Sequence, residues 1–170
     1  MSVHPLPHSP GRHPDRRPLR AVLPVLGAAT LGSVATLRGV RSSWYRGLRQ
    51  PSIQPPPSVF RYVWSVLYTM VAGASVAVER RAVESEAARY RRSLARNMAV
   101  NTAWTWVFFG AHRSRAGVGV AVALAGDSWV LARHAARTSR GAALALVPYA
   151  AWTTFAVLLN ARVVADNPQE

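Results

Sequence analysis

The chain has 170 residues, half of them apolar, and a formal net charge of +14 at pH 7. This length fits a single domain. The basic residues are all Arg and occur in every gap between apolar segments. A nucleic-acid-binding surface would concentrate them on one element, so we expect no nucleic-acid partner. The absence of cysteine excludes disulfides, thiolate metal ligands and a cysteine nucleophile.

Residues 1–20 are rich in Pro, His and Arg and are predicted to form a disordered basic tail. His4, His8 and His13 are too irregularly spaced to indicate a metal site. The first apolar segment, residues 21–37, carries no charge and would be roughly 26 Å long as a helix. Its shape also fits a signal sequence. Because further apolar segments follow, we favour a membrane span.

Four more apolar segments follow along the chain. They are residues 58–78, 94–110, 116–132 and 142–164. Lipid offers no hydrogen-bond partners to the backbone, so each membrane span must be helical. The sequence therefore predicts an all-α integral membrane bundle of five transmembrane helices over residues 21–167.

The connections between these segments differ in character. Residues 79–92 mix acidic and arginine side chains and are interpreted as a solvated linker, with a helix as one form that it could take. The short turn at 111–115 predicts that the helices on either side of it are antiparallel neighbours. Gly117, Gly119 and Ala121 allow close helix approach, which is compatible with a homodimer.

Asp127 is the one charged side chain expected deep within a span, where an ionisable group is a functional candidate. Pairing with Arg61, Arg96 or Arg133 is the simpler interpretation, and a proton or cation relay is the alternative. His112 and His134 lie at span ends, so we interpret them as interfacial residues rather than haem ligands. No metal site is predicted.

Three of the apolar segments carry aromatic and amide side chains at helical spacing. These residues are Phe60, Trp64 and Tyr68; Asn101, Trp104 and Phe108; and Tyr149, Trp152, Ala156 and Asn160. Three such faces could enclose a pocket for a flat, apolar, polycyclic ligand, which the Asn101 amide would orient.

No Asp, Glu, Lys or His is expected to face this pocket, which disfavours hydrolysis or group transfer. The alternative is that the aromatic rings only pack the core or lie at the membrane interface. We favour that alternative for Trp44, Trp106 and Trp129.

The order of these residues resembles the signature of the TspO/MBR family, the tryptophan-rich sensory proteins and translocator proteins. The first matching block contains Trp44-Tyr45, Leu48, Pro51, Pro55-Pro56, Val59-Phe60, Val63-Trp64 and Leu67-Tyr68. The other two contain Asn101, Trp104 and Phe108-Phe109-Gly110, and then Pro148-Tyr149, Trp152, Phe155-Ala156 and Leu159-Asn160.

The resemblance implies a five-helix membrane bundle that binds porphyrins, and in some members cholesterol and drug ligands, beneath the first connector. By analogy, Tyr45 and the segment from Pro51 to Pro57, which includes Pro55, would form a lid. The pocket would be lined by Trp64, Tyr68, Asn101, Trp104, Trp152, Ala156 and Leu159. Asn160 is followed by Ala161 rather than Tyr, so the C-terminal cholesterol motif of animal members is incomplete.

From this resemblance we expect a porphyrin- or haem-binding sensor or translocator-like protein that requires no cofactor. One alternative is a catalyst that degrades porphyrin with light and oxygen, with Trp64 and Trp152 as the reactive residues. Another is a transporter of porphyrin or sterol.

Overall fold

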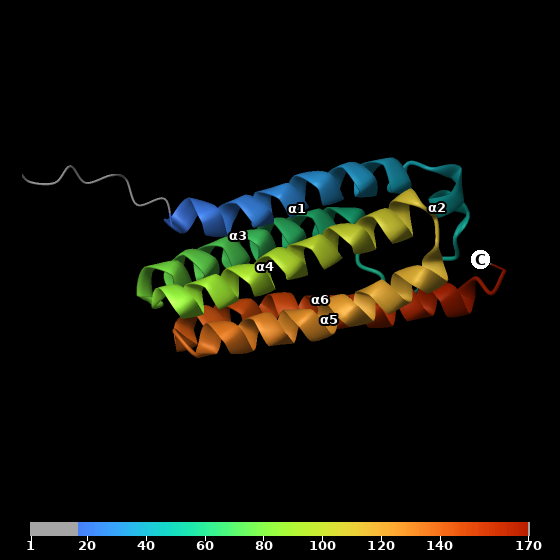
Figure 1. Ribbon diagram of the computed structural model, residues 1–170. Helices are drawn as coiled ribbons and strands as arrows, with labels where there is room; N and C mark the ends of the chain where they lie inside the picture. The colour runs from blue at the N-terminus through green and yellow to red at the C-terminus, as the bar shows by residue number, and fades with distance from the viewer. Residues whose placement is uncertain (1–16, 170) are drawn as a thin grey trace, which may run out of the picture.

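The computed structural model describes residues 17–169, and regular structure within them is entirely helical. The helices, labelled in Figure 1, are α1 (Arg17–Val40), α2 (Ser43–Gly47), α3 (Pro57–Arg81), α4 (Glu84–Thr105), the π-helical turn η1 (Trp106–Gly110), α5 (Ser114–Ala136) and α6 (Arg140–Asp166). The predicted all-α class is confirmed. The predicted tail overlaps α1 at residues 17–20, and its other residues lie outside the described part of the chain.

Within residues 17–169, four helices are long and apolar enough to cross a membrane, namely α1 from Leu19, α3, α5 and α6. Helix α4 is not among them because its first half carries a run of charged side chains between Glu84 and Arg96. The prediction of five transmembrane helices is therefore confirmed only in part.

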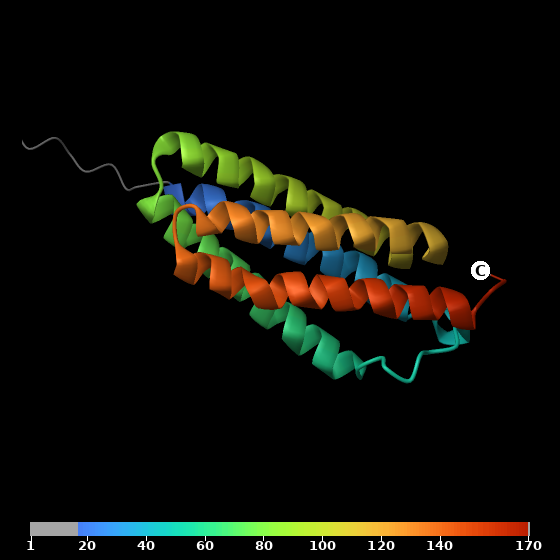
Figure 2. The same cartoon turned by 90° about the horizontal axis from the view of Figure 1, so that it is seen from below.

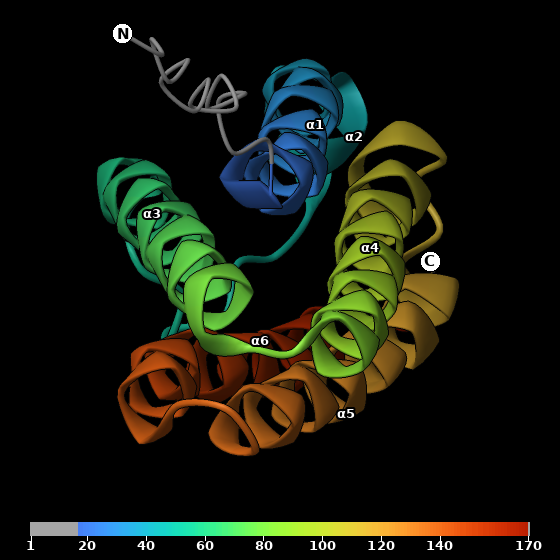
Figure 3. The same ribbon diagram turned by 60° about the vertical axis from the view of Figure 1, so that its left-hand side comes forward.

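The long helices form a closed ring. Helix α1 packs against α3 and α4, α3 packs against α6, and α5 packs against both α4 and α6. Figure 3 shows α1 between α3 and α4, with α5 and α6 on the opposite side of the bundle. Although α3 and α4 are consecutive, they contact each other very little. Figures 1 and 2 confirm that α4 and α5 are antiparallel neighbours, as the short turn predicted.

The close approach expected of the small residues in α5 occurs inside the bundle. Gly117 and Ala121 are both buried, and a Cβ atom added at Gly117 would lie 3.0 Å from the Phe108 ring and 3.6 Å from Oδ1 of Asn160. These residues therefore serve packing within one chain. A homodimer stays a prediction.

Residues 79–92 are almost entirely helical, as the helical alternative predicted, but they are not a solvated linker, because Glu79 and Tyr90 are buried. The turn consists of Ala82 and Val83 alone, and the charged residues on either side continue α3 and α4. Acidic side chains in the first turn of α4 favour its formation, because they compensate the positive end of the helix dipole.

Charge pairing explains why these residues are ordered. The side chain of Glu79, near the end of α3, is fully buried, and its Oε2 lies 2.9 Å from Nη1 of Arg91 in α4. The second amino group of Arg91 lies 2.5 Å from Oε1 of Glu84. Arg91 thus closes the α3–α4 hairpin, and Glu79 is a buried carboxylate rather than a surface charge.

At Gly39, near the end of α1, the packing leaves no room for a side chain. A Cβ atom at this position would lie 2.5 Å from Cβ and 2.8 Å from the carbonyl oxygen of Phe109, which belongs to η1. The π turn is defined by the bond from the amide of Ala111 to the carbonyl of Trp106, 2.7 Å long. It brings the backbone of η1 against α1.

Gly39→Ala is expected to lower the free energy of unfolding by about 1–2 kcal/mol, because α1 and η1 must move apart to admit the methyl group. The measurement is reversible unfolding in detergent micelles. Gly27→Ala is the matched control in the same helix, since no atom lies within 4 Å of its added Cβ. A loss of stability in the control as large as that at Gly39 would contradict the steric explanation.

Candidate functional site

Trp64 lies at the centre of a group of rings contributed by three helices. Its ring centroid is 5.4 Å from that of Tyr68, 6.1 Å from Trp104 in α4 and 6.3 Å from Tyr149 in α6. We call Trp64, Tyr68, Trp104 and Tyr149 the aromatic cluster. The aromatic faces predicted on these three helices therefore meet inside the bundle. Side chains of this cluster bridge α3 and α4, whose backbones hardly touch.

A chain of amide and hydroxyl groups runs beside the aromatic cluster. The Tyr68 hydroxyl donates to Oδ1 of Asn101 (2.9 Å), and Nδ2 of Asn101 donates to the Tyr149 hydroxyl (3.1 Å). The Tyr149 hydroxyl donates to Oδ1 of Asn97 (2.8 Å), whose Nδ2 donates to the Ser128 hydroxyl (3.2 Å). This amide–phenol chain links α3, α4, α5 and α6.

Asn101 is completely buried, and both ends of its amide already have partners. Its position suits it to hold the Tyr68 and Tyr149 rings in place. A direct contact between Asn101 and a ligand stays a prediction. Sequence reasoning missed Asn97 and Ser128, which belong to the same chain of hydrogen bonds.

Trp104, which packs on Trp64, is held in place by a hydrogen bond to α6. Its indole Nε1 donates to Oδ1 of Asn160 in α6 (3.3 Å), and Nδ2 of Asn160 donates to the carbonyl of Ala156 (2.7 Å). Trp104 is 5% exposed. Its ring orientation is therefore set by α6 as well as by its own helix.

Trp152 belongs to a second group of rings between α3 and α6. Its centroid lies 5.5 Å from Phe60 and 5.4 Å from Phe155. Its indole Nε1 is buried and has no hydrogen-bond partner in the described part of the chain. An unpaired buried donor is costly, which makes this nitrogen a natural contact for a ligand. Ala156 and Leu159 are buried further along α6.

The predicted lid residues lie in the connector between α1 and α3, next to η1. The Tyr45 ring is 5.7 Å from Phe109, which is itself 6.1 Å from Trp104 in the aromatic cluster. Burial raises the pKa of the Tyr45 hydroxyl, and a hydrogen bond from Nε2 of Gln54 (3.2 Å) partly offsets this shift. Of the lid prolines, Pro51 is buried and Pro55 is half-buried.

The structure gives partners to two polar residues singled out in the sequence. Asp127 forms an ion pair with Arg96, whose Nε lies 2.8 Å from Oδ1, so the simpler interpretation of this acid is confirmed. His112 has a φ of 55° and stacks on Trp44 at 4.6 Å. Among residues 17–169, no three His, Asp or Glu side chains are grouped so as to hold a metal ion.

Residues 21–165 match the model of the TspO/MBR family. The chain belongs to this family. It is 36% identical to protein CrtK of Rhodobacter capsulatus over 75% of the chain and 81% of that relative. The translocator protein of Ovis aries is 34% identical over 77% of the chain and 79% of its own length.

A third relative of the same TspO/MBR family is the tryptophan-rich sensory protein of Cereibacter sphaeroides. It is 31% identical over 73% of the chain and 77% of its own length. Family membership and the four apolar helices together establish a multi-pass membrane protein.

Proposed function

We propose that this TspO/MBR protein binds a tetrapyrrole, either a porphyrin or haem, within the membrane and acts as a sensor or translocator-like protein. The observation that carries the proposal is the convergence of Trp64, Tyr68, Trp104 and Tyr149 from three helices. Aromatic faces of this size suit a flat macrocycle, and stacking contributes about 0.5–1.5 kcal/mol per ring pair beyond the buried area.

The proposal includes α4 as the fifth membrane-spanning helix. Helix α4 packs along α1 and α5, which are both apolar enough to cross a membrane. A helix between two spanning neighbours occupies the same depth. Its apolar second half, which carries Trp104, would lie within the lipid, and its charged first half would reach the headgroup region.

Trp64 and Trp152 are the tryptophans we expect to touch the ligand. Both are half-buried, whereas Trp104 is nearly fully covered. Trp104 and Tyr149, which pack on Trp64, are buried, so this side of the Trp64 ring faces the bundle interior. The free indole N–H of Trp152 can donate to a carboxylate or ring nitrogen of a porphyrin. The other residues of the expected lining are Tyr68, Asn101, Trp104, Ala156 and Leu159.

Titration of the purified protein with protoporphyrin, followed by the shift of its absorbance band, tests the proposal. Trp152→Ala is expected to weaken binding at least about tenfold, because a stacking face and a hydrogen-bond donor are both lost. Trp129→Ala is the matched control: this tryptophan of α5 is 42% exposed, and its Nε1 donates to the Thr154 hydroxyl of α6. Equal losses in the two variants would show that packing had been mistaken for recognition.

Illumination separates binding from catalysis. If the protein only binds, the porphyrin absorbance persists at a fixed stoichiometry in light and oxygen. A progressive loss that disappears in the Trp64→Phe/Trp152→Phe double variant would instead support porphyrin degradation. Transport would require directional uptake into sealed vesicles, measured with the same porphyrin. The names of two relatives, translocator protein and tryptophan-rich sensory protein, are in keeping with transport and with sensing.

A further inference from the structure

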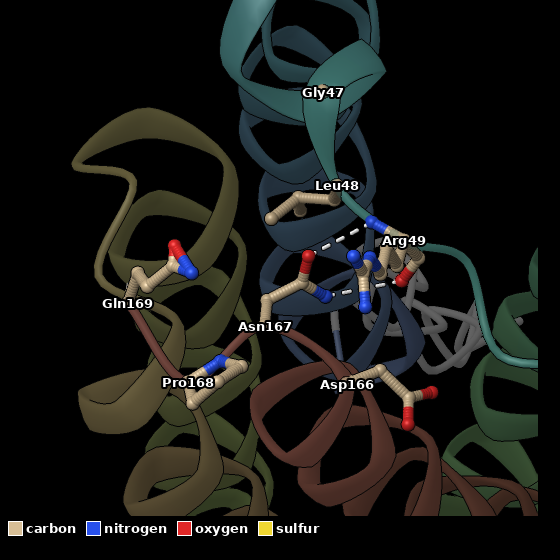
Figure 4. A pocket seen from close by; sticks show the side chains of 7 residues that line it. All are labelled: Gly47, Leu48, Arg49, Asp166, Asn167, Pro168 and Gln169. Atoms are coloured by element: carbon tan, nitrogen blue, oxygen red, sulfur yellow. Dashed lines mark hydrogen bonds between the residues drawn. The ribbon is translucent and has the colours of Figure 1, made fainter.

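Asn167, the first residue after α6, fastens the connector between α1 and α3 to the end of the bundle. Its Oδ1 accepts a bond from the backbone N–H of Arg49 (2.8 Å), and its Nδ2 donates to the backbone carbonyl of the same residue (3.1 Å). Figure 4 shows both bonds. The two residues are 118 positions apart in the chain. This contact therefore joins two segments that nothing local would bring together.

Only an amide side chain satisfies this arrangement. The second N–H of Nδ2 donates to the carbonyl of Val163 in the last turn of α6 (2.8 Å). The Asn167 side chain thus supplies one acceptor and two donors, all of them used, and it pairs with Arg49 as a backbone amide in a β-ladder would. An Asp at this position would place an anionic oxygen against two carbonyl oxygens.

Further contacts keep the two segments together. Leu48 is buried with Phe108 and Val163, and the neighbouring Tyr45 and Trp44 pack on the same group. Nη2 of Arg115 in α5 donates to the carbonyl of Pro168 (2.7 Å), which fastens the segment after α6 to α5. A cavity of about 260 Å³ remains between the segments, lined by residues 47–49 and 166–169. Space of this kind lets the connector move once its fastening is released.

We propose that Asn167 is a positioning residue, which holds the connector closed over the aromatic cluster and so sets the rate at which ligand enters and leaves. This inference rests on the proposed binding function. Its structural basis is the continuous ring contact from Tyr45 through Phe109 to Trp104. Because the connector lies at one end of this row of rings, loosening it would uncover the aromatic cluster while its own rings stay in place.

The test replaces Asn167 with Asp, which keeps the size of the side chain and removes both donors. Hydrogen exchange of the connector amides over residues 44–55 is expected to become about tenfold faster. This change corresponds to a decrease of about 1.4 kcal/mol in the free energy needed to open the connector. In stopped-flow mixing with protoporphyrin, the association and dissociation rates should both rise about tenfold. The dissociation constant should change by less than about twofold, because a gate alters both rates alike.

Two control variants isolate the amide contact. Asp166→Asn alters the neighbouring residue of the same cavity and should leave exchange and ligand rates unchanged. Arg49→Ala removes an exposed side chain but keeps the backbone groups that Asn167 binds, so it should also leave them unchanged. An effect of Arg49→Ala as large as that of Asn167→Asp would overturn the proposal in favour of an effect of charge.

Three results of the Asn167→Asp experiment would overturn the proposal that Asn167 acts as a clamp, that is, that it holds the connector closed. Unchanged exchange would mean that Asn167 does not hold the connector. Faster exchange with unchanged ligand rates would mean that the connector does not control access. A larger dissociation constant together with a lower unfolding temperature would indicate general structural damage. If the unaltered protein takes up no protoporphyrin, the proposed function fails, whereas the clamp on the connector is still decided by the exchange rates.

Discussion

Arg91→Ala is expected to lower the free energy of unfolding by about 3–5 kcal/mol, the largest loss among the substitutions considered for this chain. The variant leaves the carboxylate of Glu79 fully buried without its positive partner. One oxygen of that carboxylate, Oε1, already has no hydrogen-bond partner in the described part of the chain. Loss of Arg91 would remove the bond that its other oxygen accepts. Unfolding in mixed micelles of increasing denaturing detergent measures the difference.

A second variant distinguishes the buried charge from simple loss of packing. Arg91→Ala combined with Glu79→Gln removes the uncompensated charge and is expected to recover most of the stability. Arg92→Ala, at the exposed neighbouring position, is the matched control and should change stability by less than about 0.5 kcal/mol. If the double variant is as unstable as Arg91→Ala alone, the loss comes from packing and the electrostatic explanation is wrong.

Asn101→Leu is expected to cost about 2–3 kcal/mol, because it removes two hydrogen bonds at once from a fully buried position. The Tyr68 hydroxyl loses its acceptor, while the Tyr149 hydroxyl keeps its bond to Asn97. Leucine has a similar volume, so the change probes the polar bonds rather than a cavity. The same unfolding assay applies.

A double-mutant cycle tests whether the cost arises in the amide–phenol chain. Tyr68→Phe removes the hydroxyl that Asn101→Leu leaves unpaired, so the double variant should lose less than the sum of the single losses. Tyr62→Phe serves as the matched control, since Tyr62 is exposed on the same helix. Strict additivity between Tyr68→Phe and Asn101→Leu would contradict a shared hydrogen bond.

The sequence predicted the four apolar helices, and it predicted the face that carries Phe60, Trp64 and Tyr68, because spacing along a helix fixes which side chains share a face. It also predicted the helical class and the antiparallel pairing of α4 and α5. The spacing does not determine which faces meet, because this depends on the order of the helices in space. The ring contacts of Trp64 with Trp104 and Tyr149 depend on that order.

Other features of the structure could not be predicted from the pattern of nearby residues. Glu79 and Arg91 lie among other charges and have the composition of a solvated segment, but the tight turn at Ala82 and Val83 folds one back onto the other. The partner of Asn167 lies in a connector near the opposite end of the chain. Such pairs follow from tertiary packing, which residue spacing alone does not determine. For Asp127, by contrast, the rule that buried charges find partners was sufficient.

The order of helices around the ring has a consequence for biosynthesis. One side of α3 is covered by α1, which precedes it in the chain, and the other side is covered by α6, the final long helix. The ring therefore cannot close while α6 is still being translated, although α5 and α6 share the most extensive interface of any pair. The four long helices that precede α6 must wait, with the ring still open, until the last one is in place.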